Sequence, residues 1–162
     1  MTTAQPVRWI ENPRAGSIQT SPAVERFFPA GIARAARLAD FLHLGGIWVK
    51  DEAQRLDLGS FKVLGGSFAI YRFIQSKLGL DHPLTYAEPT SSEVRERLGN
   101  LTFAAATDGN HGRGVAWSAR QLGFQSVIYV HKHTSSARIS AIERNGAHVV
   151  VVDGTYDDAV RQ

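Results

Sequence analysis

A lysine at the expected start of a helix is the residue best suited to covalent chemistry. Lys62 stands in the run Ser-Phe-Lys-Val-Leu-Gly-Gly, where Ser60 is suited to cap the helix. A helix start opposes a cation, and apolar neighbours such as Phe61 and Val63 withdraw an amine from water, so both effects favour the neutral amine. A neutral amine can attack a carbonyl, whereas an ordinary lysine extends its charge into solvent. The run is therefore compatible with Schiff-base chemistry at Lys62, and the alternative from the residues alone is an ordinary surface lysine.

A second candidate site is the run Thr-Asp-Gly-Asn-His-Gly, residues 107–112, which follows a predicted strand at 101–106. Ligands of open α/β sheets lie at the carboxyl ends of strands, and a helix start offers unpaired N–H groups to an anion. Asp108 has two interpretations, a general base or the N-cap of the following helix. The run is therefore expected to bind a carboxylate or a phosphate.

Other chemistries lack the residues they need. Neither run has the order of a P-loop or of the dinucleotide fingerprint G-x-G-x-x-G. The Asp-His pair has no second ligand pair at metal spacing and no G-x-S-x-G beside it, so no metal site and no serine triad is predicted. His131 and His133 are interpreted as solvated loop residues.

The elements that must position these runs alternate regularly in the second half of the chain. Before Ile32 the sequence has no period and is expected to form an extended arm with a short helix. Helices are predicted at residues 32–44, 61–78, 92–98, 113–122 and 135–145, a further helix begins after Gly154, and strands are predicted at 46–50 (buried), 101–106, 126–130 and 148–152. Strands separated by single helices indicate right-handed βαβ units, and therefore an α/β fold with a parallel sheet flanked by helices.

Composition narrows the function classes further. The 162 residues are 43% hydrophobic and 20% charged, with a net charge of +3 and no cysteine. Disulfides, thiolate metal sites and thiol catalysis are thereby excluded. Basic residues are not gathered in a block, and no apolar run reaches the roughly 18 residues that span a bilayer, so neither nucleic acid nor a membrane is an expected partner. Without a signal peptide, the expected location is cytoplasmic.

The pairing of S-F-K-x-x-G with a later G-N-H-G resembles the tryptophan-synthase-β-like (fold type II) pyridoxal-phosphate (PLP) enzymes, and the resemblance covers roughly residues 45–160, including the segment Arg138–Val150. It implies that Lys62 carries the cofactor, with Phe61 beside it, and that Asn110 donates a hydrogen bond to the 3′-oxygen of PLP. It also implies that the loop from Thr107 through Asp108 and Gly109 to His111 holds the substrate carboxylate.

One position narrows the resemblance. Dehydratases of this family usually carry serine where this chain has Asp108, and T-D-G-N-H-G-R-G-V-A-W with an earlier K-D-E is similar to the ammonia-lyases that act on 2,3-diaminopropionate. By that resemblance Asp108 takes the α-proton of the D-isomer, and elimination gives pyruvate and ammonia. The alternatives are a serine or threonine dehydratase-type enzyme, a non-catalytic α/β remnant or binding module, and a nucleotide-binding α/β domain supported by the sheet pattern alone.

The resemblance also implies a domain organisation. Residues 1–90 would be an N-terminal arm and part of the large PLP domain, including the lysine helix, and residues 91–162 a small βαβ domain that is incomplete at its C-terminus. Family members are well over twice as long, so the fold is expected to be truncated, with apolar faces exposed. A homodimer is the expected assembly, and the activity of the isolated chain is left open.

Overall fold

A computed structural model describes residues 32–85, 88–107 and 109–162. The chain divides into two compact units between Phe61 and Lys62. The arm and short helix predicted before Ile32 lie outside the described residues. The predicted domain boundary at residue 90 concerns the family fold and stays a prediction.

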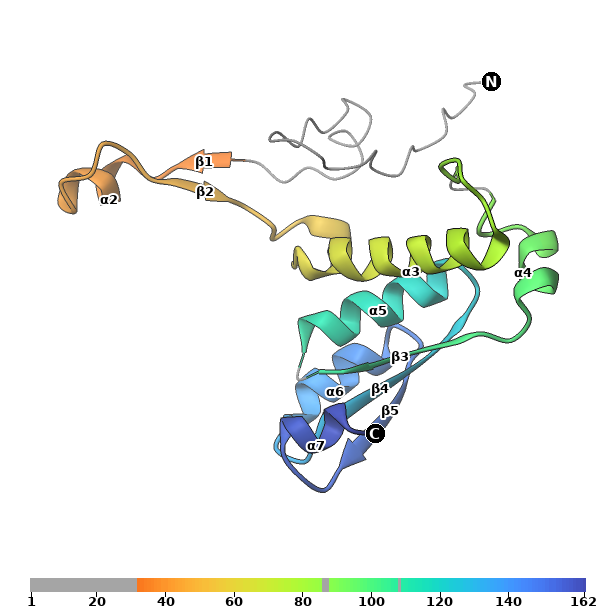
Figure 1. Ribbon diagram of the computed structural model, residues 1–162. Coiled ribbons are helices and arrows are strands. Elements are labelled where there is room, and N and C mark those ends of the chain that lie inside the picture. The colour runs from red at the N-terminus through yellow and green to blue at the C-terminus, as the bar shows by residue number, and fades with distance from the viewer. Residues whose placement is uncertain (1–31, 86–87, 108) are drawn as a thin grey trace. The chain divides into compact units, whose positions relative to one another are not determined.

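The unit before Lys62 is a two-stranded antiparallel ribbon with a short helix between its strands (Figure 1). Strand β1 (Ile32–Arg34) pairs with β2 (Trp48–Lys50), with Ala33 opposite Val49, and α2 (Ala36–Phe41) connects them; a 3₁₀ turn, η1 (Arg55–Asp57), follows. Several large apolar side chains of this unit are exposed, namely Leu38, Phe41, Leu42, Leu44, Trp48 and Val49.

Two predictions for this unit are wrong. The helix predicted at 32–44 is confined to α2, because residues 32–34 pair with β2 and their backbone groups are used between strands. The strand predicted at 46–50 exists, but β2 is exposed along its length instead of buried. A ribbon of two strands has no second layer of its own to cover either face, and sequence pattern alone does not reveal this.

From Lys62 onward, a three-stranded parallel sheet organises the chain, as predicted. Its order is β3-β4-β5, formed by β3 (Thr102–Ala106), β4 (Gln125–His131) and β5 (His148–Val152). Ala105 lies opposite Ile128, which in turn lies opposite Val149. The side chains of β4 alternate between buried and half-buried positions, so the sheet presents one well-covered face.

Five helices belong to this unit in the described residues, and their bounds agree with the predictions to within a few positions. They are α3 (Lys62–Leu78), α4 (Ser92–Leu98), α5 (Asn110–Gln121), α6 (Ser136–Glu143) and α7 (Tyr156–Val160). The Ser91 hydroxyl accepts from the Val94 N–H at the start of α4. Thr155 and Asp158 form a capping box that begins α7.

The core of this unit lies between α3, α5 and the sheet. Helix α5 runs between α3 and the strands (Figure 1). Its small residues Ala116 and Ala119 are fully buried, as are Ile74 of α3 and Ile128 of β4. Because small side chains on α5 let both neighbours approach, the position of α3 relative to β3 is fixed through α5. In the described ranges, no helix is long and apolar enough to cross a membrane.

Candidate active site

The first turn of α3 lies directly against α5 at a glycine. A Cβ atom built on Gly114 would stand 2.9 Å from Cα and 3.1 Å from N of Val63, and 3.4 Å from the carbonyl carbon of Lys62. Backbone atoms cannot move away as a flexible side chain can, so this position requires glycine. The contact places the backbone of Lys62 beside the first two turns of α5.

The same crossing continues one turn further along α3. A Cβ on Gly66 would touch Val115 at ordinary van der Waals distance, 3.5 Å from Cγ2. Val63 and Val115 are both buried. Backbone-to-backbone contact and apolar burial therefore hold the N-terminal halves of the two helices together.

Thr107 builds the turn between β3 and α5. Its hydroxyl accepts from the N–H groups of Gly109 at 3.1 Å and Gly112 at 3.3 Å, and its own N–H donates to the Tyr129 carbonyl at 2.9 Å. A Cβ on Gly112 would collide with the Thr107 methyl group and stand 2.8 Å from Cγ2 of Ile128. Thr107 is buried and holds the loop by its side chain, while its predicted contact with a substrate carboxylate stays a prediction.

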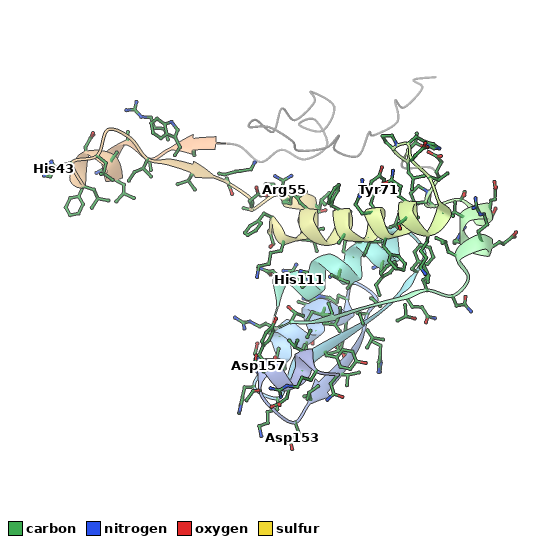
Figure 2. All side chains as sticks on the ribbon, in the orientation of Figure 1. His43, Arg55, Tyr71, His111, Asp153 and Asp157 are labelled. Carbon is green, nitrogen blue, oxygen red and sulfur yellow. The ribbon has the colours of Figure 1, made fainter. Side chains whose placement is uncertain are left out.

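Helix α5 begins three residues earlier than predicted. Asn110 and His111 lie in its first turn, whereas the sequence placed both in a turn before a helix at Arg113. Two glycines in this stretch lowered the predicted helical propensity, but the Thr107 hydroxyl satisfies the Gly112 N–H and stabilises an early start. Asn110 and His111 are therefore exposed on a rigid element (Figure 2 labels His111).

Asp108 lies outside the described residues. The N-cap of α5 is Gly109, and the side-chain acceptor at the helix start is Thr107. In the described residues the Thr107 hydroxyl accepts one N–H of the helix start, that of Gly112, and the N-cap interpretation of Asp108 stays a prediction. Its interpretation as a general base stays a prediction.

Lys62 opens α3 with an exposed side chain. The prediction of a partly dry setting is wrong for the described residues: Val63 is 1% exposed, but Phe61 is 61% exposed. Successive residues of a helix point about 100° apart, so Val63 is buried beside Gly114 of α5 while Lys62, the residue before it, is exposed. The predicted contact of Phe61 with a cofactor stays a prediction.

An apolar cavity of about 370 Å³ opens beside this crossing, between α3, β3 and α5. Gly65, Gly66 and Phe73 of α3 line one wall, and β3 lines another. His111 contributes an imidazole from the first turn of α5. Neither Lys62 nor Asn110 lines the cavity, so it adjoins the candidate site without containing these two side chains.

Arg113 is a polar residue of the site that the sequence interpretation did not single out. It lies one turn after Asn110 on α5, and its Nη1 donates to Asn110 Oδ1 at 3.4 Å. Its Nε is buried and has no hydrogen-bond partner among the described residues. The signal in the sequence was its place in the G-N-H-G-R-G run.

In the described ranges, no three His, Asp or Glu side chains gather as a metal site would require.

The loop that leads to the lysine is held by an ion pair within the first unit. Arg55, 5% exposed, donates from Nε to Glu52 Oε2 and from Nη2 to Glu52 Oε1, the latter at 3.0 Å. Leu56 and Asp57 adopt left-handed backbone angles, with φ of 50° and 56°, which are uncommon for these residue types. The bidentate pair fixes the start of this strained segment.

The same pair shifts the titration of its carboxylate. The hydrogen bond from Arg55 lowers the pKa of Glu52, the charges of Arg55 and Lys50 lower it further, and desolvation partly opposes them. The Lys50 ammonium lies 3.5 Å from Glu52 Oε1. Glu52 therefore stays ionised in the folded chain at a lower pH than a free glutamate.

Comparison with known proteins identifies the family. Residues 27–162 match the family described as pyridoxal-phosphate dependent enzymes. The chain belongs to this family. The PLP-enzyme resemblance of the two runs is thereby confirmed, because both lie inside the matched region.

Among relatives of this PLP-enzyme family, the chain is similar to diaminopropionate ammonia-lyases. It is 45% identical to that of Salmonella typhimurium over 127 residues, 78% of this chain and 31% of the relative. It is 42% identical to that of Escherichia coli K12 over 133 residues, 82% of this chain and 33% of the relative. The chain thus spans about a third of the length of the curated relatives it matches.

Solved structures agree with the fold. The apo form of the Escherichia coli diaminopropionate ammonia-lyase superposes with a TM-score of 0.74 at 42% identity, covering 82% of this chain and 36% of that one. A threonine deaminase isoform of Solanum lycopersicum has a TM-score of 0.55 at 19% identity, covering 99% and 41%, and this likeness concerns the fold alone. The predicted α/β fold of the type II PLP enzymes is confirmed for the part that these residues cover.

The glycine contact predicts an asymmetric pair of variants. Gly114→Ala should destabilise the chain by about 1–3 kcal/mol, because a methyl group meets the Val63 backbone. Gly65→Ala on α3, with nothing within 4 Å of the added Cβ, should stabilise it by up to about 1 kcal/mol through helix propensity. Both are Gly→Ala changes inside helices, so the difference between their free energies of unfolding reports the packing of the added methyl group. Urea unfolding measures these free energies. Equal free energies of unfolding for the two variants would contradict the contact.

The Glu52–Arg55 pair predicts a pH dependence of local opening. Because the pKa of Glu52 is lowered on folding, its contribution is complete above the unfolded value of 4.5 and is lost as the pH falls through the lower folded value. Hydrogen exchange of the Leu58 and Gly59 amides, which donate to the Arg55 carbonyl, should accelerate across that range relative to amides of β4. Glu52→Gln should remove the pH dependence, and an unchanged profile in this variant would argue against the pair as its cause.

Proposed function

We propose that this chain carries the cofactor lysine and the substrate loop of a PLP-dependent ammonia-lyase that eliminates ammonia from 2,3-diaminopropionate. The observation that carries the proposal is the contact of Gly114 with the backbone of Val63 and Lys62, which seats the start of α5 beside the start of α3. Similarity to diaminopropionate ammonia-lyases at 42–45% identity supports the substrate class.

The residues present fit the cofactor. A lysine that binds an aldehyde must have an accessible amine, and Lys62 is exposed on the first turn of its helix. The phenolic oxygen on the planar PLP ring needs a hydrogen-bond donor held on a rigid element. Asn110 is exposed on the first turn of α5 and carries such a donor. Gly114 brings these two helix starts together, so the fit rests on backbone contact.

In the proposed mechanism, Lys62 would hold PLP through its side-chain amine and would be the group that takes the cofactor back after each turnover. PLP, when bound, would supply an electron sink for the charge left at Cα. Asn110 would donate to the 3′-oxygen of the cofactor, and Thr107, Gly109 and His111 of the loop would orient the substrate carboxylate.

Proton transfer is assigned to Asp108. Its carboxylate takes the Cα proton of the D-isomer, the β-amino group leaves as ammonia, and hydrolysis of the released product gives pyruvate and a second ammonia. A negative charge beside a substrate with two amino groups favours a diamino acid over serine. We further propose a cytoplasmic homodimer, as the family resemblance implies, and sedimentation analysis tests the assembly.

Covalent labelling tests the lysine. After incubation with PLP and reduction with borohydride, the pyridoxyl group should be found on Lys62, because this residue is exposed and its backbone lies beside the start of α5. Lys77, in the last turn of the same helix, is the matched control, since it should be labelled only at higher PLP concentration. Lys62→Ala should abolish the high-affinity label, whereas Lys77→Ala should leave it unchanged. Equal labelling of both lysines would contradict a cofactor site.

The second candidate is a serine or threonine dehydratase, favoured by 28% identity to an L-threonine dehydratase of Haemophilus influenzae. Pyruvate release from D-2,3-diaminopropionate, L-2,3-diaminopropionate and serine by the PLP-loaded protein separates the two. We expect preference for the diamino acid, and Asp108→Asn should lower turnover of the D-isomer by roughly 100-fold or more, the usual contribution of a general base. Preference for serine would favour the dehydratase.

A further inference from the structure

Arg113 and Asn110 occupy the same side of α5. They are the fourth and first residues of the helix, so three positions separate them and their side chains are neighbours. The Nη1 group of Arg113 donates to Oδ1 of Asn110 at 3.4 Å. The only acceptor atom of the Asn110 side chain is therefore directed toward the guanidinium.

This contact determines which way the amide faces. The two ends of an asparagine side chain have nearly the same shape, and only hydrogen-bond partners distinguish them. A guanidinium donates but cannot accept, so it selects the oxygen of the amide and turns the NH₂ group away. With Arg113 in place, Asn110 presents its donors to whatever lies in front of the helix start.

Arg113 contributes little that would stabilise the helix. A cation near the start of α5 is opposed by the helix dipole, and its Nε is buried with no partner in the described part of the chain. Arg120 provides a contrast on the same helix. It lies in the last turn, where a cation is favoured, and its Nη1 donates to the Arg144 carbonyl at 3.2 Å. The position of Arg113 is thus better explained by its contact with Asn110.

We propose that Arg113 is a positioning residue that locks the Asn110 amide with its NH₂ group toward the phenolic oxygen of PLP. The cofactor part of this inference rests on the proposed function, whereas the orientation of the amide depends only on residues of this chain. Asn110→Asp follows as a distinctive variant: its carboxylate still pairs with Arg113 but offers the cofactor no donor.

The orientation is tested without cofactor by nuclear magnetic resonance of the side-chain amide of Asn110, assigned by its loss in Asn110→Asp. Arg113→Met keeps a long apolar stem and removes the donor, so the Asn110 amide signals should move toward those of a mobile asparagine. Arg113→Lys, which retains a cationic donor, should move them less. Asn145, whose Nδ2 donates to the Ala141 carbonyl at 2.8 Å, is an internal reference that should not move.

Cofactor affinity is tested by a double-mutant cycle. We expect Arg113→Met to weaken PLP binding roughly tenfold, as loss of a charge-assisted hydrogen bond would. Combining Arg113→Met with Asn110→Ala should weaken it no more than Asn110→Ala alone, because Arg113 acts through Asn110. Arg120→Met, which removes the same charge from α5, should leave the affinity unchanged. If the loss of PLP affinity in the double variant equals the product of the losses in the two single variants, the inference is wrong.

The two proposals fail in different ways. If PLP does not label Lys62 in the unaltered chain, the proposed function fails, and the Asn110 signals alone decide the orientation. If Lys62 is labelled but the Asn110 signals are the same in Arg113→Met, the positioning role is wrong and the proposed function stands.

Discussion

The contact between Gly114 of α5 and the backbone of Val63 determines the geometry of the candidate site. It is a contact between two main chains, so the separation of the helices cannot be adjusted by side-chain rotamers. Lys62 precedes Val63, and Asn110 lies one turn before Gly114. Any change in this separation moves the amine relative to the amide, although neither side chain takes part in the contact.

The start of α5 is tied in turn to the Thr107 hydroxyl. Thr107 is buried at the end of β3, tied to β4 through its N–H, and its side chain accepts from the N–H groups of Gly109 and Gly112. The sheet therefore sets where the helix begins. Gly112 has no room for a Cβ beside Thr107 and Ile128 and so serves close packing, whereas a Cβ on Gly109 would meet nothing within 4 Å. Rigid helix turns, instead of a loose loop, present Asn110 and His111.

The two arginine side-chain clusters, one in each unit, are satisfied unequally. The Glu52–Arg55 pair is bidentate and holds the segment that leads to the lysine within its own unit. Arg113 donates to Asn110 but leaves Nε buried without a partner in the described residues. A polar side chain whose hydrogen bonds are all made within the protein needs no ligand. A side chain with a buried unpaired donor is typical of a binding site, where a bound molecule supplies the missing partner.

The sequence by itself determined the alternation of strands and helices, the parallel sheet, the helix at Ser92–Leu98 and the strand at His148–Val152, since these follow from local periodicity and caps. It also singled out Lys62 and Asn110 by their motifs. Only the tertiary structure decided that α5 begins at Asn110, that residues 32–34 form a strand, and that Lys62 is exposed while Val63 is buried beside α5. Each of these depends on a contact outside the segment itself, with the Thr107 hydroxyl, strand β2 or helix α5. The local residue pattern does not reveal such contacts.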